Sequence, residues 1–207
     1  MSVTTPATPA LSFECLVTAI GQAHAELAAQ ASRAVNASLT LRNWLIGFYI
    51  EEYERHGVDR QQYGEKLLDR LAESLQQKGV SRCDRRELYR YRQFYLTYPR
   101  IVEALPPQSA SRLGDAAPAL AAGIRIVESV TPQSGIDGHT LLARLSFTHF
   151  VELIAVEDDT MRAFYEAECL RGNWSVRELK RQVASLYYER SGLSTDKQRL
   201  STMAQTG

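Results

Sequence analysis

The sequence predicts an all-α protein that is built from several amphipathic helices. Apolar residues recur at helical spacing through most of the 207-residue chain, whereas the alternating pattern of strands is sparse. Residues that start and end helices stand at the ends of these apolar stripes. Hydrophobic residues make up 44% of the chain and charged residues 23%, so a core of normal size is available.

The first three helices follow a lead-in rich in Thr, Pro and Ala. Residues 14–34 are rich in Ala, Glu and Gln, with apolar residues at helical spacing, and residues 37–56 continue with a second apolar stripe. Gly57 is the expected end of that stripe, as a left-handed cap residue. A third helix is expected over about 61–78, closed by Gly79.

A fourth helix is expected over residues 82–98. Ser81 looks like its N-cap, because Asp84 three residues later completes an imperfect capping box. Pro99 follows the last residue of this helix. The third and fourth helices are joined by the short segment 78–81, which has the general form of a helix-turn-helix.

The second half of the chain contains three more predicted helices. They cover residues 145–155, 160–171 and 176–190, and Ser175 with Glu178 forms a clean capping box before the third. The segment between the two halves is rich in Pro, Gly and Ala and is expected to be a linker with one short helix near 119–128. The expected organisation is therefore a disordered lead-in (1–13), an N-terminal helical half (14–105), a linker or excursion (106–143), a C-terminal helical half (144–192) and a polar tail (193–207).

The helix predicted at 82–98 has an arginine face. On a helical wheel its apolar residues fall in one arc and its arginines on the rest. The window 82–100 holds six arginines against two acidic residues, a net charge of +4, although the whole chain has a formal net charge of zero. Guanidinium groups bind phosphate in a bidentate way and pair with guanine edges. The residues expected to contact DNA are Arg82, Arg85, Arg86, Tyr89, Arg90, Arg92 and Gln93.

Two other charged regions bear on this interpretation. A secondary basic patch is expected at Arg177, Lys180 and Arg181, although a solvated helix face explains these three residues as well. Residues 152–168 carry six acidic residues against one arginine, a net charge of −5. This acidic stretch is an alternative partner for the arginine face, either within the fold or in another subunit. The alternative function is therefore an assembly or adaptor domain for a nuclease subunit or a homodimer.

The sequence offers one catalytic pattern, and it is weak. Glu178 and Lys180 form an ExK triplet, and Asp158 lies about twenty residues upstream, as in metal-dependent PD-(D/E)xK nucleases. In that class the triplet lies on a strand, whereas here Glu178 belongs to a helix capping box. No glycine-rich phosphate loop, GxSxG or HExxH motif is present. We therefore expect no catalytic residues, and a nuclease remains only a third interpretation.

Metal sites, disulfides and membrane segments are not expected. The cysteines are three in number and far apart, and the four histidines do not cluster. No segment approaches the length of about 20 apolar residues that spans a bilayer. The N-terminus lacks a basic region and a long apolar run, so it is not a secretory signal. These observations predict a cytoplasmic protein without a cofactor or a metal.

Several blocks of the sequence resemble the N-terminal region of YhcG-like bacterial proteins, over roughly residues 14–198. The blocks are Val35-Asn36, NWLIGFYIEEYE (43–54), YGEKLLDRLAESL (63–75), RRELYRYRQFYLTYP (85–99), LSFTHFVELI (145–154), RAFYEAE (162–168) and WSVRELKRQVASLYYER (174–190). The resemblance implies a helical DNA-binding domain of otherwise unknown function. It also implies that a PD-(D/E)xK nuclease domain usually follows, and that the family is associated with mobile elements and defence against foreign DNA.

The chain departs from that family in two ways. It stops at Gly207, where a nuclease domain would follow, and its SRCDRREL segment is more arginine-rich than the usual start of this helix. The expectation is therefore a non-catalytic module that recruits DNA through its arginine face. Such a module would work with a nuclease subunit or arise from a truncated or split gene.

Overall fold

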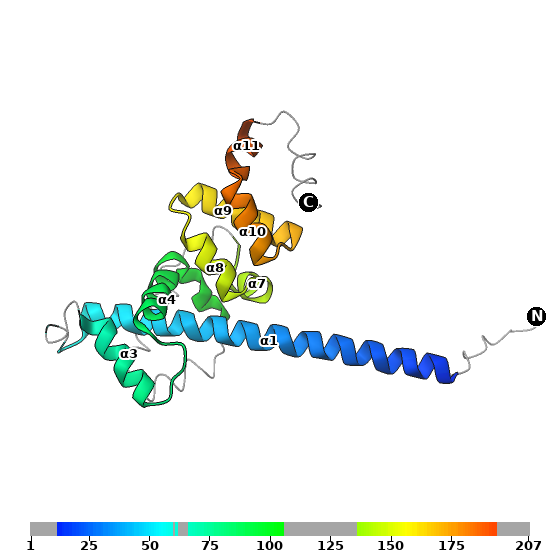
Figure 1. Cartoon of the computed structure of the whole chain (residues 1–207), viewed down its shortest axis with the longest axis horizontal. Coiled ribbons are helices and arrows are strands. Elements are labelled where there is room, and N and C mark those ends of the chain that lie inside the picture. The colour runs from blue at the N-terminus through cyan, green and yellow to red at the C-terminus, as the bar shows by residue number, and fades with distance from the viewer. Residues whose placement is uncertain (1–11, 60, 62–65, 106–135, 194–207) are drawn as a thin grey trace, which may run out of the picture.

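The structure, a computed structural model, describes residues 12–59, 61, 66–105 and 136–193 (Figure 1). Every regular element among them is helical, which confirms the predicted all-α class. The elements are α1 (Phe13–His56), α3 (Leu67–Gln77), α4 (Arg85–Thr97), the 3-10 helix η2 (Pro99–Ala104), α7 (Gly138–Arg144), α8 (Phe147–Ile154), α9 (Asp159–Gly172), α10 (Val176–Ala184) and α11 (Tyr187–Leu193). None of the helices in these ranges is long and apolar enough to cross a membrane.

Helix α1 is one continuous helix of 44 residues, where the sequence predicted two. No Gly or Pro interrupts residues 35–36, so nothing breaks the backbone hydrogen bonding between the two stripes. The prediction of a left-handed Gly57 is wrong, because its φ is −59°. Glycine is required there for a different reason: a Cβ would lie 2.6 Å from the carbonyl oxygen of Tyr53, to which the Gly57 amide donates.

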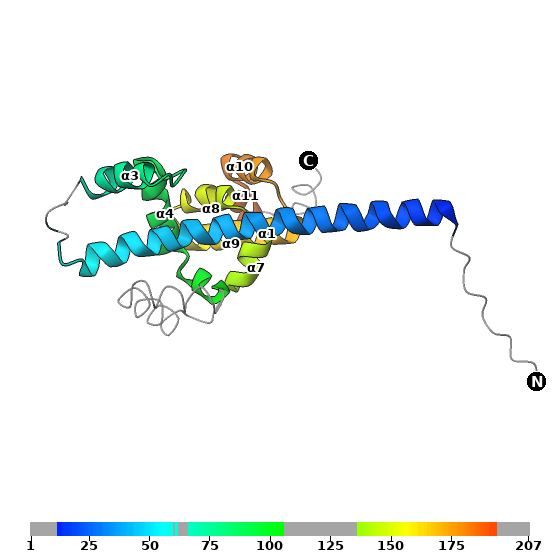
Figure 2. The same cartoon turned by 90° about the horizontal axis from the view of Figure 1, so that it is seen from below.

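The second half of α1 runs through the body of the molecule, and the first half projects beyond it (Figures 1 and 2). Asn36 marks the border, since its side chain donates to the Leu145 carbonyl at 3.4 Å. Beyond it, Trp44 and Phe48 are fully buried against α4, and Trp44 Nε1 donates to the Tyr98 carbonyl at 2.8 Å.

One aromatic core joins the two halves of the sequence. Phe94 from α4 packs on Phe150 from α8 at a centroid distance of 4.6 Å, and Tyr98 contacts the same ring at 4.9 Å. Trp174 and Tyr187 extend the cluster toward α11. The N-terminal and C-terminal helical halves therefore share this aromatic core.

Helix α7 is an element that the sequence did not predict. It lies in the region expected to be linker, begins after the cap residue Asp137 and buries Leu141 and Leu142 against η2 and α1. A side chain at Gly138 would overlap the Arg100 carbonyl, so glycine permits the contact with η2. The predicted helix at 119–128, the lead-in before residue 12 and the tail after residue 193 lie outside the described residues.

The last predicted helix has the predicted capping box but not the predicted length. The Ser175–Glu178 capping box is present at the start of α10. The helix predicted to continue to residue 190 instead breaks at Ser185, and Leu186 has a left-handed φ of 52°. Leu186 is exposed rather than part of the apolar stripe, because this turn directs Tyr187 into the core.

Candidate nucleic-acid interface

Helix α4 is held against α1 and α3 by its apolar side, as predicted. Leu88 and Tyr91 are buried in a cluster with Ile50 of α1, and Leu71 and Leu75 of α3 pack against it. The other residues of the predicted apolar arc, Phe94, Tyr95 and Tyr98, are also buried. This docking leaves the opposite side of the first turns of α4 facing outward.

The helix begins at Arg85, three residues later than predicted. Asp84 rather than Ser81 is its N-cap, and the Asp84 carboxylate accepts from the Glu87 amide at 2.9 Å. The connection from α3 therefore extends over residues 78–84 and is longer than the expected segment 78–81. Gly79 is left-handed, with φ of 72°, as its predicted closing role requires.

Arg82 lies in this connection, outside the helix, and has a left-handed φ of 55°. Such a backbone is uncommon for a residue other than glycine and persists only where its surroundings hold it. Two hydrogen bonds do so: the Tyr91 hydroxyl donates to the Arg82 carbonyl at 2.7 Å, and Arg42 Nη2 donates to the Ser81 carbonyl at 2.8 Å. The adjacent Cys83 is buried, so the connection is anchored on both sides of Arg82.

Three arginines stand on the outward side of this region. Arg82 and Arg86 are exposed, and neither forms an ion pair within the part of the chain that the structure describes. Arg85 forms an ion pair of 3.2 Å with Asp69 of α3, but both side chains are more than half exposed. Tyr89 lies one turn further along α4 with 53% of its surface exposed. These four residues form what we call the α4 front.

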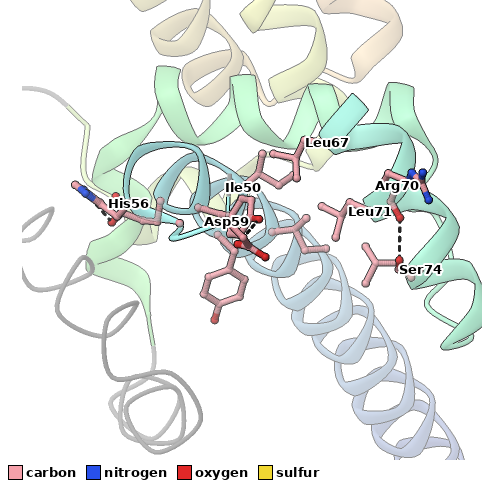
Figure 3. A pocket seen from close by; sticks show the side chains of 13 residues that line it. Ile50, His56, Asp59, Leu67, Arg70, Leu71 and Ser74 are labelled. Carbon is pink, nitrogen blue, oxygen red and sulfur yellow. Dashed lines mark hydrogen bonds and ion pairs between the residues drawn. The ribbon is translucent and has the colours of Figure 1, made fainter. Parts of the chain in front are cut away.

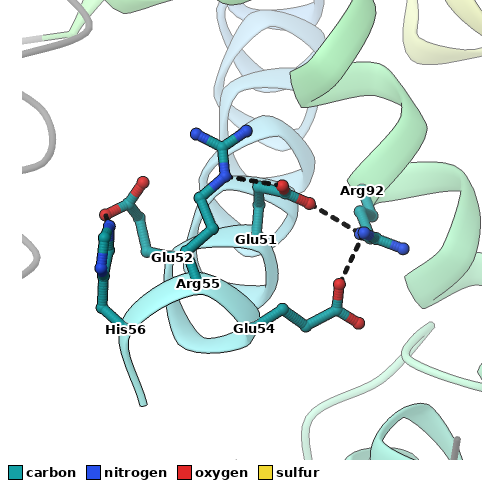
Figure 4. Close-up of polar contacts among 6 residues, drawn as sticks. All are labelled: Glu51, Glu52, Glu54, Arg55, His56 and Arg92. Atoms are coloured by element: carbon teal, nitrogen blue, oxygen red, sulfur yellow. Dashed lines mark hydrogen bonds and ion pairs between the residues drawn. The ribbon is translucent and has the colours of Figure 1, made fainter.

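Arg92 belongs to the fold rather than to the α4 front. Its Nε lies 2.8 Å from Glu51 Oε2 and its Nη2 lies 2.6 Å from Glu54 Oε2, both on α1 (Figure 4). Burial would raise the pKa of the Glu51 carboxyl, but hydrogen bonds from Arg92 and Arg55 lower it below its usual value. The guanidinium of Arg92 is therefore engaged by two carboxylates and faces α1.

The last two residues of the predicted DNA-contacting set are partly buried. Arg90 pairs with Glu87 on its own helix at 2.9 Å, and the exposed fraction of its side chain is 33%. Gln93 is half-buried. The predicted seven residues thus separate into an exposed group at the start of α4 and a group that faces the fold or its own helix.

The acidic stretch 152–168 does not supply the carboxylates that pair with α4. Those come from α1, from α3 and from α4 itself. Within the stretch, Glu166 pairs with Arg100, Glu168 pairs with Arg171, and Glu152 lies 3.1 Å from Lys180. Of the six arginines in the window 82–100, only Arg100, which follows the end of α4, forms an ion pair with the acidic stretch among the described residues.

The secondary basic patch lies on the surface of α10, and the residues of the nuclease pattern lie at the starts of α9 and α10. Arg177 and Arg181 are exposed on α10. Asp158 is the N-cap of α9, where it accepts from the Met161 amide at 2.7 Å, and Glu178 accepts from the Ser175 amide at 2.6 Å. Among the described residues no group of three or more His, Cys, Asp or Glu side chains could hold a metal ion.

An apolar groove of about 880 Å³ lies between the end of α1 and α3 (Figure 3). Ile50, Leu67 and Leu71 contribute much of its wall. Two of its polar groups already have partners, since the Tyr53 hydroxyl donates to Asp59 at 2.7 Å and Ser74 donates to the Arg70 carbonyl. Its remaining lining includes the ionisable residues Glu52, His56, Asp59 and Arg70.

Sequence reasoning missed the residues that position the α4 front. Arg42 is an isolated basic residue of α1 in the sequence, and Tyr91 was assigned to the core without its hydroxyl contact. Gly47 was also missed: a methyl group there would overlap the Tyr91 carbonyl, so glycine allows α4 to cross α1 closely. A lone glycine within a strongly helical pattern was the available signal for this crossing.

Comparison with known proteins identifies similar sequences. Residues 19–111 and 130–190 match the model of the family described as the DUF1016 N-terminal domain. The chain is 36% identical over 168 residues to the protein named "Putative nuclease YhcG" from Escherichia coli (strain K12). That alignment covers 80% of this chain and 43% of the relative, so the chain spans less than half of the relative's length. No solved structure matches the chain significantly.

Proposed function

The chain belongs to the DUF1016 N-terminal domain family, and from this premise we propose that it is a non-catalytic module that binds DNA through the α4 front. One observation carries the proposal. Arg82 and Arg86 are exposed with no ion pair in the described structure, while Arg92 of α4 is engaged by two carboxylates. The predicted contact set is thereby reduced to Arg82, Arg85, Arg86 and Tyr89.

The chemistry of the α4 front suits a phosphate backbone. Each guanidinium offers parallel N–H donors that match two phosphate oxygens, and a tyrosine hydroxyl adds a further donor. The nearby carboxylate of Asp84 is engaged as the N-cap of α4, where it accepts a hydrogen bond from the Glu87 amide. Hydrogen bonds to the carbonyl oxygens of Ser81 and Arg82 hold the backbone of this connection. Less backbone conformational entropy is therefore lost when Arg82 binds a phosphate.

The relative of this chain carries the word nuclease in its printed name. We propose that the DNA held by the α4 front is presented to a nuclease domain or subunit. Asp158 and Glu178, which a PD-(D/E)xK interpretation would need as metal ligands, each accept a backbone hydrogen bond at a helix start. Catalysis is therefore assigned to a different part of the system.

An assembly role for the arginine face has less support. Its proposed counterpart was the acidic stretch 152–168 of another subunit, but Glu152, Glu166 and Glu168 already pair with basic side chains of their own chain. Arg92 and Arg90 likewise have partners. Phosphate groups from outside the protein remain the better match for the guanidinium groups of Arg82 and Arg86, which form no ion pair among the described residues.

The proposal is tested by fluorescence anisotropy with a labelled DNA duplex between about 50 and 200 mM salt. The unmodified chain should bind with an affinity that falls steeply with salt. Arg82→Ala combined with Arg86→Ala should lower the affinity on the order of tenfold and reduce the salt slope by about 1.8, since each phosphate contact contributes about 0.9.

Two matched variants separate contact from general charge. Arg82→Lys with Arg86→Lys keeps the charge and should retain most of the salt slope. Arg177→Ala with Arg181→Ala removes the same charge from the secondary basic patch on α10 and should bind nearly as well as the unmodified chain. Equal losses in the α4 and α10 pairs, or an unchanged slope for the α4 pair, would contradict the assignment.

A further inference from the structure

The arginines in and before α4 differ in how far carboxylates engage them. Arg82 and Arg86 form no ion pair among the described residues, whereas Arg92 is engaged by two carboxylates of α1. Arg85 is intermediate. Its Nε lies 3.2 Å from Oδ1 of Asp69, which stands in the first turn of α3, and the two side chains are 68% and 51% exposed. Arg85 is therefore held by one carboxylate, in a contact that is open to water.

The contact between Arg85 and Asp69 contributes little to the fold. It joins one nitrogen to one oxygen, and an exposed ion pair of this kind changes an equilibrium constant by roughly fivefold at most. Helix α3 is joined to α4 by apolar packing instead, since Leu71 and Leu75 lie against the buried cluster that contains Leu88. The ion pair can therefore open while α4 stays docked.

The carboxylate of Asp69 and a DNA phosphate are alternative partners for one guanidinium. Both groups present negatively charged oxygen acceptors to its N–H donors. We propose that Asp69 restrains DNA binding by the α4 front: its carboxylate holds Arg85 in the free protein, and this ion pair opens when Arg85 contacts a phosphate. The inference rests on the proposed function of the α4 front and adds a residue of α3 that limits its affinity.

Competition, rather than orientation of the arginine, is the role that fits the geometry. A carboxylate pair that fixes a guanidinium is seen at Arg92, which Glu51 and Glu54 hold at 2.8 and 2.6 Å. The Glu51 side chain is also buried, so that arrangement is shielded from water. Asp69 offers a single longer contact to an exposed side chain. Removal of the Asp69 charge should therefore strengthen DNA binding rather than weaken it.

Asp69→Asn tests the competition in the full chain, by fluorescence anisotropy with a labelled DNA duplex at about 100 mM salt. The affinity should rise by roughly three- to fivefold, the upper range for an exposed ion pair. Asparagine keeps the size of the side chain, and thermal unfolding followed by circular dichroism checks that α3 is intact.

Glu73→Gln is the matched control. Glu73 is exposed one turn further along α3, on the same side of the helix as Asp69, and forms no ion pair among the described residues. The substitution removes the same charge and should change the affinity by less than about twofold, because salt screens charges that are not in contact. An equal gain from Glu73→Gln would overturn the proposal.

A double-mutant cycle with Arg85 separates competition from general repulsion of DNA. In the Arg85→Ala background, Asp69→Asn should no longer strengthen binding, because the carboxylate has no guanidinium to hold. An equal gain in both backgrounds would overturn the proposal, since Asp69 would then act on the DNA directly. Weaker binding by Asp69→Asn alone would also overturn it, because Asp69 would then orient Arg85 for binding.

The same measurements distinguish this inference from the proposed function. If the unmodified chain binds DNA through Arg82 and Arg86 but Asp69→Asn has no effect, the role of Asp69 is wrong and the α4 front stands. If the unmodified chain does not bind, or if loss of Arg82 and Arg86 leaves binding unchanged, the α4 front is not the interface and both proposals are overturned.

Discussion

Arginines of similar sequence context have different roles in this protein because their neighbours differ. Arg86 is exposed, whereas Arg92, two turns along the same helix, donates to Glu51 and Glu54. A helical wheel of α4 alone places both outside the apolar arc. The difference arises from α1, whose carboxylates lie beside Arg92 in the fold. Charge on one helix therefore predicts a basic face but not which of its members are free to bind.

The role of Arg92 gives a prediction at this scale. Arg92→Gln should lower the free energy of unfolding by about 2 kcal/mol at neutral pH, because a hydrogen bond to a buried carboxylate is lost. The lowered pKa of Glu51 means that its stabilising contribution is complete above its unfolded value of 4.5 and is lost as pH falls through the folded pKa. The difference in free energy of unfolding between the Arg92→Gln variant and the unmodified chain should therefore become smaller at acidic pH.

Chemical denaturation at several pH values measures this difference in free energy of unfolding. Arg86→Gln, an exposed position on the same helix, is the matched control and should change stability little at any pH. The contrary pattern, with Arg86→Gln destabilising and Arg92→Gln neutral, would reverse the division of α4 into a binding front and a structural back.

At the scale of elements, the crossing of α1 and α4 positions the candidate interface. Gly47 lets the two backbones approach at Tyr91, and the hydroxyl of Tyr91 in turn holds the Arg82 carbonyl. Gly47→Ala should lower the free energy of unfolding by about 2 kcal/mol, because the added methyl would overlap the Tyr91 carbonyl and force the two helices apart. Thermal and denaturant unfolding measure the loss.

Gly21 provides the comparison for that substitution. It lies in the projecting half of the same helix, with no atom near enough to meet an added Cβ. Gly21→Ala should leave the unfolding midpoint unchanged or raise it, because alanine favours helix by up to about 1 kcal/mol over glycine. A stable Gly47→Ala variant would show that α4 does not depend on close approach to α1.

Local signals predicted the elements better than they predicted their ends. The sequence predicts the capping box of Ser175 and Glu178 correctly, because both residues lie within one helical turn of each other. The prediction of Ser81 as the N-cap is wrong. Hydrogen bonds from Arg42 and Tyr91, both outside this segment, set the backbone conformation of residues 81–82 before α4. The break at Leu186 likewise depends on the burial of Tyr187 among aromatic residues from other helices. The arginine face was predictable, but its exposed subset required the tertiary fold.

At the scale of the molecule, one core spans both halves of the sequence, so we predict that they unfold together. The chain has two tryptophans, one in each half: Trp44 packs against α4, and Trp174 packs against Tyr187. Trp44→Phe leaves a reporter in the C-terminal half, and Trp174→Phe leaves one in the N-terminal half. In each variant, at fixed protein concentration, the fluorescence transition in denaturant should coincide with the loss of helical circular dichroism, as two-state unfolding requires. If Trp174 fluorescence changed at a lower denaturant concentration than the helical signal of the same variant, the C-terminal helices would form a separate unit, and the shared contacts of Phe94 and Phe150 would not couple the two halves.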